Sequence, residues 1–315
     1  MTVIDHRALG ATGPLVSTIG LGCNNFGRKG TRTEGQEGTT AVLDEAVELG
    51  VTLLDTADMY GGAPGVSETL MGVALGANRD RVVLATKFGH QDFDMGIAGA
   101  KGSRAYIRTA IDGSLRRLRT DRVDLYQMHT PDPVTPIAET IAALDELVVE
   151  GKILNYGHSN FSAEQIAEAA LAGGRFVSAQ SEYSLVAREV EKGVLPAVIE
   201  FGLGFLPYFP LANGLFTGKF SRTERPSDTR IMRQRPHVVE NAPWDAIEEY
   251  ERLCAARGIT ILEATFAWLL AQPGLTSVIA GVTSPEQLAQ NAAASTTTLS
   301  ADDVAEISRI FSPAR

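Results

Sequence analysis

The sequence predicts an α/β protein, a (β/α)8 TIM barrel with an N-terminal β-hairpin and a long loop after the seventh strand. Short apolar runs alternate eight times with longer stretches of helical periodicity along the 315 residues. Most of the runs are continuously apolar, which is typical of parallel strands buried on both faces. A doubly wound, nucleotide-binding sheet would carry G-x-G-x-x-G at its first strand–helix turn, but this turn reads GLGCNNFG and lacks the fingerprint.

Eight segments are predicted to form the barrel strands. They are STIGLG (17–22), VTLLDT (51–56), RVVLATK (81–87), VDLYQMH (123–129), KILNYGHS (152–159), RFVSAQS (175–181), LGFLPYF (203–209) and LTSVIAG (275–281). Before the first of them, RALGATGPLV has glycine-rich turn chemistry, so we expect a hairpin at about residues 5–17.

Capping residues mark the beginnings of several helices. Ser162 with Gln165 and Ser284 with Gln287 have the S-x-x-Q spacing of a capping box. Pro285 then occupies the first position of the second of these helices, where its missing N–H costs nothing.

Two segments lie outside the eight plain strand–helix units. A loop of about residues 211–241 follows the seventh strand, and an extra helix is expected at about residues 300–312. Loops of this length are usually functional. Together with the hairpin, these elements are predicted to form one barrel domain over residues 1–315.

Composition and charge restrict the function. The net charge is −10, and the one short basic stretch, SLRRLR (114–119), lies in a helical pattern, so a nucleic-acid partner is not expected. Cys23 and Cys254 are far apart and form no metal or disulfide spacing, so no metal site is predicted. The N-terminus lacks a secretory apolar core, and no run of 18 apolar residues exists, so we expect a cytoplasmic protein without a membrane partner.

Polar and ionisable residues close several of the apolar runs, where barrels of this kind carry their catalytic groups. The second strand ends at Asp55, with Tyr60 in the loop beyond it; the third ends at Lys87 and the fourth at His129. Lys87 would lower the pKa of Tyr60, and Asp55 would keep Lys87 charged. This set can polarise and protonate a carbonyl, and we expect a hydride cofactor to supply the electrons. Asp58 is predicted to be a loop hydrogen-bond acceptor.

The chain resembles the aldo-keto reductases over nearly its whole length. The matching segments, in the family's order, are RALGATGPLVSTIGLG, LLDTADMYGG, VVLATKFG, VDLYQMHTPDP, GKILNYGHSNFS, FPLANGLFTGK and VIAGVTSPEQLAQN. The resemblance implies that hydride moves between a nicotinamide cofactor and an aldehyde, ketone or sugar-like carbonyl. It places the catalytic tetrad on Asp55, Tyr60, Lys87 and His129, with Tyr60 as the general acid and base.

The same resemblance implies a cofactor site. Ser159, Asn160 and Gln180 would bind the carboxamide, and Tyr208 would stack on the nicotinamide ring. The other implied positions are Gly22, Cys23, Asp55, Phe209, Pro210, Leu211, Gly214, Lys219, Arg230, Gly281, Thr283, Gln287, Gln290 and Asn291. Thr283 replaces the cation that many relatives direct at the 2′-phosphate, although Lys219 or Arg230 could compensate. The threonine weakens the case for a strict preference for NADP(H). NADP(H) is favoured on the family's habit, and NAD(H) remains possible.

A second hypothesis also follows from the resemblance. Some barrels of this family act as cofactor-binding regulatory subunits of membrane channels, with little turnover. This chain begins almost at its hairpin, without a long extra N-terminal segment, which favours a free-standing enzyme acting on a small carbonyl or alcohol substrate. The segment Cys23-Asn24-Asn25 departs from the family's usual residues on the substrate side, so the resemblance does not specify the substrate or the oligomeric state.

Overall fold

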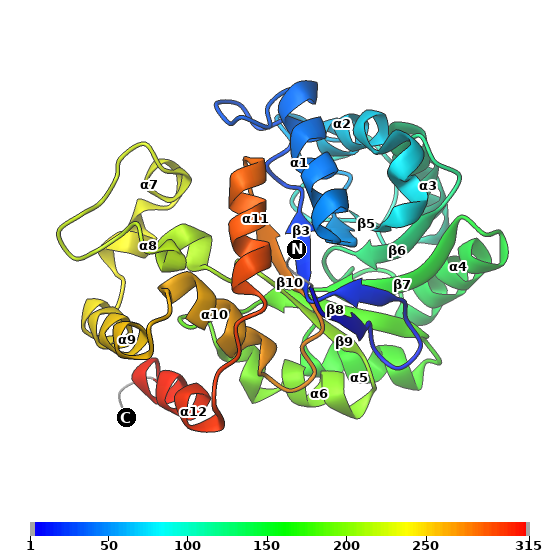
Figure 1. Ribbon diagram of the computed structural model, residues 1–315. Coiled ribbons are helices and arrows are strands. Elements are labelled where there is room, and N and C mark those ends of the chain that lie inside the picture. Colours follow the sequence, from blue (N-terminus) through cyan, green and yellow to red (C-terminus); the bar gives the residue numbers. More distant parts are fainter. Residues whose placement is uncertain (1–3, 313–315) are drawn as a thin grey trace.

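The structure is a computed structural model, and it describes residues 4–312. Its main sheet consists of eight parallel strands in the order β10-β3-β4-β5-β6-β7-β8-β9. The strands are β3 Ile19–Gly22, β4 Leu53–Asp55, β5 Val83–Phe88, β6 Val123–Met128, β7 Ile153–Ser159, β8 Phe176–Glu182, β9 Gly204–Tyr208 and β10 Val278–Gly281. An isolated parallel bridge between Phe205 of β9 and Leu275, three residues before β10, brings the two outer strands together and leaves the barrel nearly closed. The predicted (β/α)8 barrel is confirmed (Figure 1).

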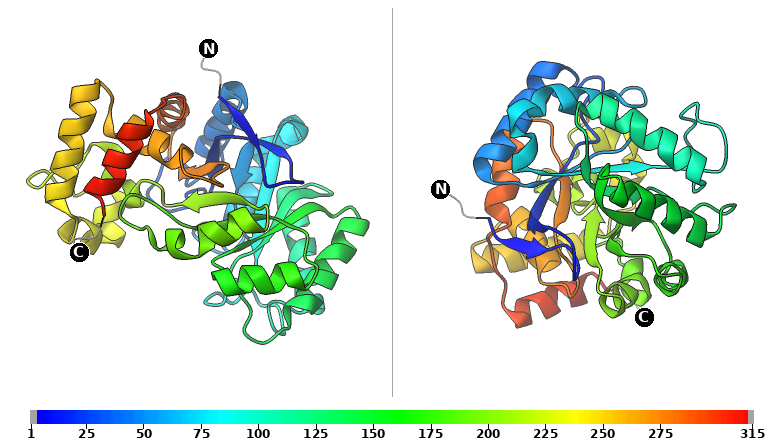
Figure 2. Two further views of the ribbon diagram at one scale, coloured as in Figure 1. Left: turned by 90° about the horizontal axis from the view of Figure 1, so that it is seen from below. Right: turned by 90° about the vertical axis from the view of Figure 1, so that its right-hand side faces the viewer.

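Helices surround the barrel, and each barrel strand leads outward into helical structure (Figure 2). The α-helices flanking the strands are α1 Gln36–Leu49, α2 Val66–Leu75, α3 Arg104–Leu118, α4 Ile137–Val149, α5 Ala163–Leu171, α6 Val194–Glu200, α9 Trp244–Arg257, α10 Ile261–Leu270, α11 Pro285–Ala294 and α12 Ala301–Ile310. Short 3-10 helices lie at η1 Gly76–Arg81 and η2 Glu189–Lys192. The apolar faces of the helices pack on the outside of the sheet and form the larger of two hydrophobic cores.

The segment predicted as a long loop after the seventh strand is present but partly helical. It contains η3 Ala212–Thr217, α7 Arg230–Gln234 and α8 Pro236–Glu240. Figure 1 shows α7 and α8 set off from the strands, on the far side of α11 from α1. Helices of five residues are too short to produce a periodic apolar pattern, so the sequence did not reveal them.

One of the two predicted capping boxes is formed in full. Ser162 accepts the N–H of Gln165, and the Gln165 side chain accepts the N–H of Ser162. At α11 the prediction is half wrong. Ser284 accepts the N–H of Gln287, but Gln287 reaches back to Thr283, whose N–H it accepts at 2.8 Å. Because Ser284 is extended at the helix entrance, Thr283 is the residue whose N–H faces Gln287.

A hairpin closes the amino end of the barrel. Its strands are β1 His6–Ala8 and β2 Leu15–Ser17, and Leu9 and Val16 enter a core inside the barrel that is separate from the larger one. The other residues of this inner core are Leu53, Ala85, Leu125, Val177, Leu206 and Ile279. The guanidinium of Arg7 fixes the hairpin by donating to two backbone carbonyls at 3.0 and 2.9 Å. The carboxyl ends of the strands therefore form the end at which a site can open.

Among residues 4–312, no single helix is long and apolar enough to cross a membrane. Only α9 and α10 together reach the required length and composition, as a pair bent by 94°.

Candidate active site

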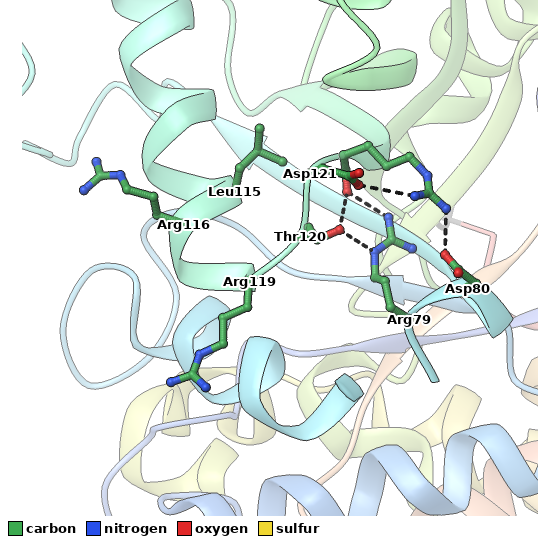
Figure 3. Close-up of a pocket in the computed structure, with 8 residues that line it drawn as sticks. Arg79, Asp80, Leu115, Arg116, Arg119, Thr120 and Asp121 are labelled. Carbon is green, nitrogen blue, oxygen red and sulfur yellow. Dashed lines mark hydrogen bonds and ion pairs between the residues drawn. The ribbon is translucent and has the colours of Figure 1, made fainter. Parts of the chain in front are cut away.

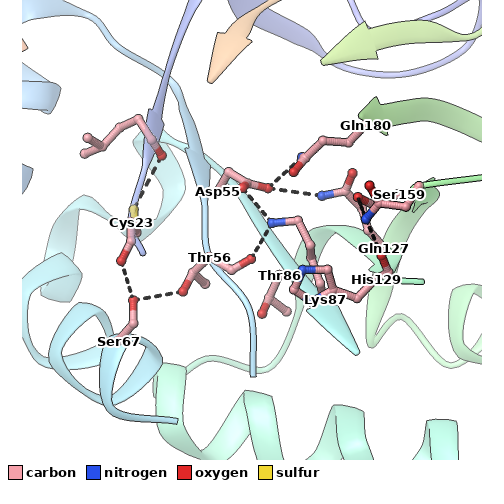
Figure 4. Close-up of polar contacts among 12 residues, drawn as sticks. Cys23, Asp55, Thr56, Ser67, Thr86, Lys87, Gln127, His129, Ser159 and Gln180 are labelled. Atoms are coloured by element: carbon pink, nitrogen blue, oxygen red, sulfur yellow. Dashed lines mark hydrogen bonds and ion pairs between the residues drawn. The ribbon is translucent and has the colours of Figure 1, made fainter. Parts of the chain in front are cut away.

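A polar layer lies directly above the inner core. Asp55 and Lys87 come two residues after Leu53 and Ala85, whose side chains fill the barrel interior. Gln127 has the same position on β6 and pairs in register with Lys87. Because side chains alternate between the two faces of a strand, all three project into the barrel, one layer nearer its carboxyl end (Figure 4).

Asp55 and Lys87 form a fully buried ion pair. Lys87 Nζ donates to Asp55 Oδ2 at 2.6 Å and to the carbonyl of Thr56 at 2.9 Å. Asp55 Oδ1 accepts from the amide nitrogens of Gln127 and Gln180, each at 3.1 Å. Burial works to lower the pKa of Lys87, but Asp55 and Tyr60 outweigh it and raise that pKa above its usual value. The ammonium group is therefore charged and rigidly held.

Tyr60 and His129 lie next to this ion pair. Lys87 Nζ is 5.1 Å from the centroid of the Tyr60 ring, and the Tyr60 and His129 rings meet edge to face with centroids 5.7 Å apart. Burial raises the pKa of Tyr60, and Lys87 opposes this without reversing it. The expected effect of Lys87 is thus correct in sign, but the pKa of Tyr60 lies above its usual value because desolvation of the phenolate is the larger effect.

His129 is neutral in this environment. Burial, and then the positive charges of Lys87 and His90, hold its pKa well below the usual range. The structure therefore brings together all four side chains of the tetrad implied by the resemblance, with both Tyr60 and His129 uncharged at neutral pH.

Two residues of the site were missed by the sequence analysis. Gln127 is a ligand of Asp55, and its signal was available: it lies two residues after Leu125, on the inward face of its strand. The ring of His90 packs edge to face on His129 with centroids 4.7 Å apart. His90 lies in a loop that Lys101 holds by donating to the carbonyls of His90, Gln91 and Phe93, and no periodic pattern marks such a position.

The residues implied to bind a carboxamide form one cluster beside the tetrad. Asn160 has a positive φ of 63°, and its N–H donates to the Gln180 carbonyl at 2.9 Å. Its side-chain nitrogen donates to Ser159 Oγ and to the His129 carbonyl, at 3.1 and 3.0 Å. The Tyr208 hydroxyl donates to Asn160 Oδ1 at 2.9 Å. This network fixes the amide of Asn160 between β7 and β9.

Backbone pairing and hydrogen bonds position Gly22 and Cys23. Gly22 pairs with Asp55 on one side and with Gly281 on the other, and the Cys23 N–H donates to the Asp55 carbonyl at 2.9 Å. Burial, and then the charge of Asp55, raises the pKa of the Cys23 thiol well above its usual value. The thiol is therefore protonated and unreactive.

The backbone after β9 adopts conformations that non-glycine residues rarely adopt. Phe209, Ala212 and Asn213 have φ values of 52°, 46° and 60°, and Gly214 has a φ of 107°. Several N–H groups of this stretch are used within it: Ala212 donates to the Phe209 carbonyl at 2.9 Å, and Gly214 donates to the Leu211 carbonyl at 2.9 Å. These short-range bonds hold the left-handed residues in place. Of the remaining positions in this stretch, Pro210 is buried, Leu211 precedes η3, Lys219 is exposed, and Arg230 begins α7.

The positions at α11 form the other end of the implied cofactor site. Gln287 Oε1 accepts from both the N–H and the hydroxyl of Thr283, at 2.8 and 3.2 Å. Asn291 is buried on the same helix, Gln290 is exposed, and Gly281 is exposed at the end of β10. The amides near the tetrad and this helix N-terminus are groups on which a dinucleotide that carries phosphates can bind.

Asp58 is the residue for which the sequence prediction is wrong. Its side chain is 1% exposed, and neither carboxylate oxygen has a hydrogen-bond partner among the described residues. Burial, and then the charge of Glu68, raises its pKa to about 7. The cause lies in the backbone: the Asp58 N–H donates to the Lys87 carbonyl at 3.1 Å, which ties the loop to β5 with this side chain turned inward.

The cavity in Figure 3 is not part of this site. Its volume is about 610 Å³, and it is lined by Arg79, Asp80, Leu115, Arg116, Arg119, Thr120, Asp121 and Arg122. These residues precede β5 and β6, at the opposite end of the strands from Lys87 and His129. Over residues 4–312, no group of three or more His, Cys, Asp or Glu side chains has the arrangement of a metal site.

Comparison with known proteins identifies the family of the chain. Residues 18–311 match the family model described as the Aldo/keto reductase family. The chain is also 36% identical over 299 residues to the uncharacterized oxidoreductase YrpG of Bacillus subtilis (strain 168). The matched region covers 90% of this chain and 89% of that protein.

Proposed function

Since the chain belongs to the aldo/keto reductase family, a family of oxidoreductases that generally use nicotinamide cofactors, we propose that it is an NAD(P)H-dependent carbonyl reductase. The substrate class is an aldehyde, ketone or sugar-like carbonyl, interconverted with its alcohol. The observation that carries the proposal is the contact set of Tyr60, in which a half-buried phenol lies against both a fixed ammonium and a neutral imidazole.

The cofactor supplies the hydride in reduction and accepts it in oxidation. Ser159, Asn160 and Gln180 would hold its carboxamide, and Tyr208 would pack on the nicotinamide ring. Lys219, Arg230 and the N-terminus of α11 would hold its phosphates. Thr283 carries no charge that could bind a 2′-phosphate, but Lys219 and Arg230 are both cations. We therefore favour NADP(H) over NAD(H).

Tyr60 provides the proton. Its raised pKa keeps the phenol protonated at neutral pH, so that Oη carries a proton to donate to the carbonyl oxygen. Lys87 stabilises the phenolate that forms, and Asp55 fixes Lys87 through the contact at 2.6 Å. Neutral His129 donates a hydrogen bond to the same oxygen and orients the substrate.

Replacing Tyr60 tests the proposal. Tyr60→Phe removes the proton donor and leaves the ring, so kcat should fall by about 10²- to 10⁴-fold. The dissociation constant for NADPH, measured by fluorescence quenching, should stay close to that of the wild type. Tyr250→Phe is the matched control, because its hydroxyl bonds only within the α9–α10 region, and it should retain activity.

Two results would contradict the proposal. Undiminished turnover in Tyr60→Phe would remove Tyr60 as the acid, and a failure of the wild type to bind NADPH or NADH would remove the oxidoreductase assignment. Tight cofactor binding by the wild type, with negligible consumption of NADPH at 340 nm across a panel of aldehydes, would instead favour the regulatory-subunit hypothesis.

A further inference from the structure

Three arginines from two distant segments meet beside the tetrad. Arg28 follows β3, and Arg230 and Arg235 lie at the beginning of α7 and directly after its end; we call these three residues the arginine cluster. Arg28 Nη1 and Arg230 Nε both donate to the same oxygen, Gln234 Oε1, at 2.9 and 3.1 Å. Two guanidinium groups therefore share one neutral acceptor.

In the described part of the chain no carboxylate pairs with the arginine cluster, although the charge of Arg235 acts to lower the pKa of Glu182 against the larger, raising effect of burial. Among residues 4–312, none of its three guanidinium groups forms an ion pair, and the other side-chain partner of Arg230 is the neutral Asn25 Oδ1 at 3.1 Å. Arg28 Nε is buried with no partner. Burial, and then the charges of Arg28 and Arg235, lower the pKa of Arg230 to about 10. Uncompensated like charges at this spacing favour the binding of an anion.

The arginine cluster lies near Tyr60, the proposed general acid, and near the aromatic residues at the end of β9. Tyr60 is close enough that its phenolate form raises the pKa of both Arg28 and Arg230, against the larger effect of burial. Arg235 lies over the ring of Phe209, 5.0 Å from its centroid, and Phe209 packs edge to face on Tyr208. The positive charge thus extends from the general acid to the aromatic wall formed by β9.

We propose that Arg28 and Arg235 bind a carboxylate or phosphate group carried by the carbonyl substrate. This inference rests on the proposed reductase function and adds a substrate class to it. Lys219 and the N-terminus of α11 already provide for the cofactor's phosphates at the other end of the site, whereas Arg28 and Arg235 have no such role. Arginine suits the task because its planar fork can donate two hydrogen bonds to one anionic group.

A pair of aldehydes of equal shape tests the proposal. 4-Carboxybenzaldehyde and 4-formylbenzamide differ in charge at one position, and the wild type should reduce the carboxylate with the higher kcat/KM. Arg28→Gln and Arg235→Gln should each raise KM for 4-carboxybenzaldehyde by about 10- to 100-fold, the loss of one charge-assisted hydrogen bond, and should leave its kcat and the KM for 4-formylbenzamide nearly unchanged.

Two surface arginines provide matched controls. Arg32 lies in the same loop as Arg28, its side chain is 75% exposed, and its ion-pair partner is Glu286 at 3.5 Å. Arg233 is an exposed residue of α7 that donates to the backbone of Asp228. Arg32→Gln and Arg233→Gln should not change the ratio of kcat/KM between the two aldehydes.

Other outcomes overturn the proposal and leave the reductase function standing. Equal kcat/KM for both aldehydes in the wild type would do so. If Arg28→Gln and Arg235→Gln weaken both aldehydes equally and weaken NADPH binding, the arginine cluster serves the phosphates of the cofactor. If neither aldehyde is reduced, calorimetry can compare the binding of benzoate and benzamide to the protein–NADPH complex. Tighter binding of benzoate supports the proposal, and equal affinity for the two contradicts it.

Discussion

At the scale of single residues, the buried carboxyl groups of Asp55 and Asp58 differ in their partners. Asp55 is bound by one ammonium and two amides, whereas Asp58, three residues later, has no hydrogen-bond partner for either oxygen among the described residues. Among the described residues, the hydroxyls of Tyr106 and Tyr126 are likewise buried without partners, and burial, followed by the charge of Asp58, raises the pKa of both. Desolvation without compensation makes the ionised form of Asp58 costly to the fold.

Asp58 should therefore make stability depend on pH. The unfolded carboxyl loses its proton near pH 4, whereas the folded one keeps it up to about pH 7. Between these values the folded state binds more protons, so the free energy of unfolding falls as pH rises, and the penalty is complete above pH 7. As the pH rises from 4 to 8, the free energy of unfolding of Asp58→Asn should increase relative to that of the wild type by up to about 4 kcal/mol.

Urea unfolding at several pH values measures this gain. Asp121→Asn is the control, since the Asp121 side chain is 87% exposed and its removal should change stability by less than about 1 kcal/mol. Parallel curves of unfolding free energy against pH for Asp58→Asn and the wild type would show that Asp58 is ionised in the folded protein across this range.

Residue chemistry also explains what the sequence could and could not predict about the site. Asp55, Lys87 and His129 stand at the ends of apolar runs, so strand order alone brought them together. Gln127 was predictable from inward alternation along β6 but was overlooked. The arginine cluster was not predictable, because only the folding of residues 211–241 brings Arg230 to the same Gln234 oxygen as the distant Arg28.

At the scale of elements, the continuous apolar runs located the barrel strands because burial on both faces leaves little freedom in residue type. The boundaries depended on local geometry instead. The pairing of Gln287 with Thr283 rather than with Ser284, for example, follows from the extended conformation of Ser284 at the entrance of α11. Helix packing also depends on local geometry, because the close approach of two helix backbones leaves no mark in the hydrophobic periodicity of the sequence.

The close approach of α2 and α3 requires a glycine. A Cβ added at Gly72 would lie 2.3 Å from the carbonyl oxygen of Arg117 and 2.6 Å from the carbonyl carbon of Leu118, both backbone atoms of α3. Helix propensity favours alanine by about 1 kcal/mol, but overpacking against a rigid backbone costs more. Gly72→Ala should therefore lower the free energy of unfolding by about 1–3 kcal/mol in urea titrations.

Gly113→Ala, on α3, is the control for Gly72→Ala. Its added Cβ would meet Arg117 Nη1 at 3.0 Å, the end of a flexible side chain that can move. We expect its stability to stay within about 1 kcal/mol of the wild type. A Gly72→Ala protein as stable as Gly113→Ala would mean that α2 and α3 can separate without cost.

At the scale of the whole molecule, the two ends of the barrel have different tasks. The hairpin fills the amino end with Leu9 and Val16, and the polar layer of Asp55, Lys87 and Gln127 begins above the inner core. In barrels of this kind the amino end contributes to stability and the carboxyl end to function. Changes to the hairpin should therefore affect folding and not the reaction.

Leu9→Ala tests this separation. Leu9 is fully buried in the inner core, so its truncation should lower the free energy of unfolding by about 2–5 kcal/mol through lost burial and the cavity that remains. Leu15→Ala, at a side chain 66% exposed, should cost little. Below the unfolding transition, both variants should keep the wild-type kcat and KM, because neither residue contacts the ion pair of Asp55 and Lys87. A fall in kcat for Leu9→Ala at a temperature where circular dichroism shows a folded protein would mean that the inner core transmits strain to that ion pair, and the division between the two ends would then be wrong.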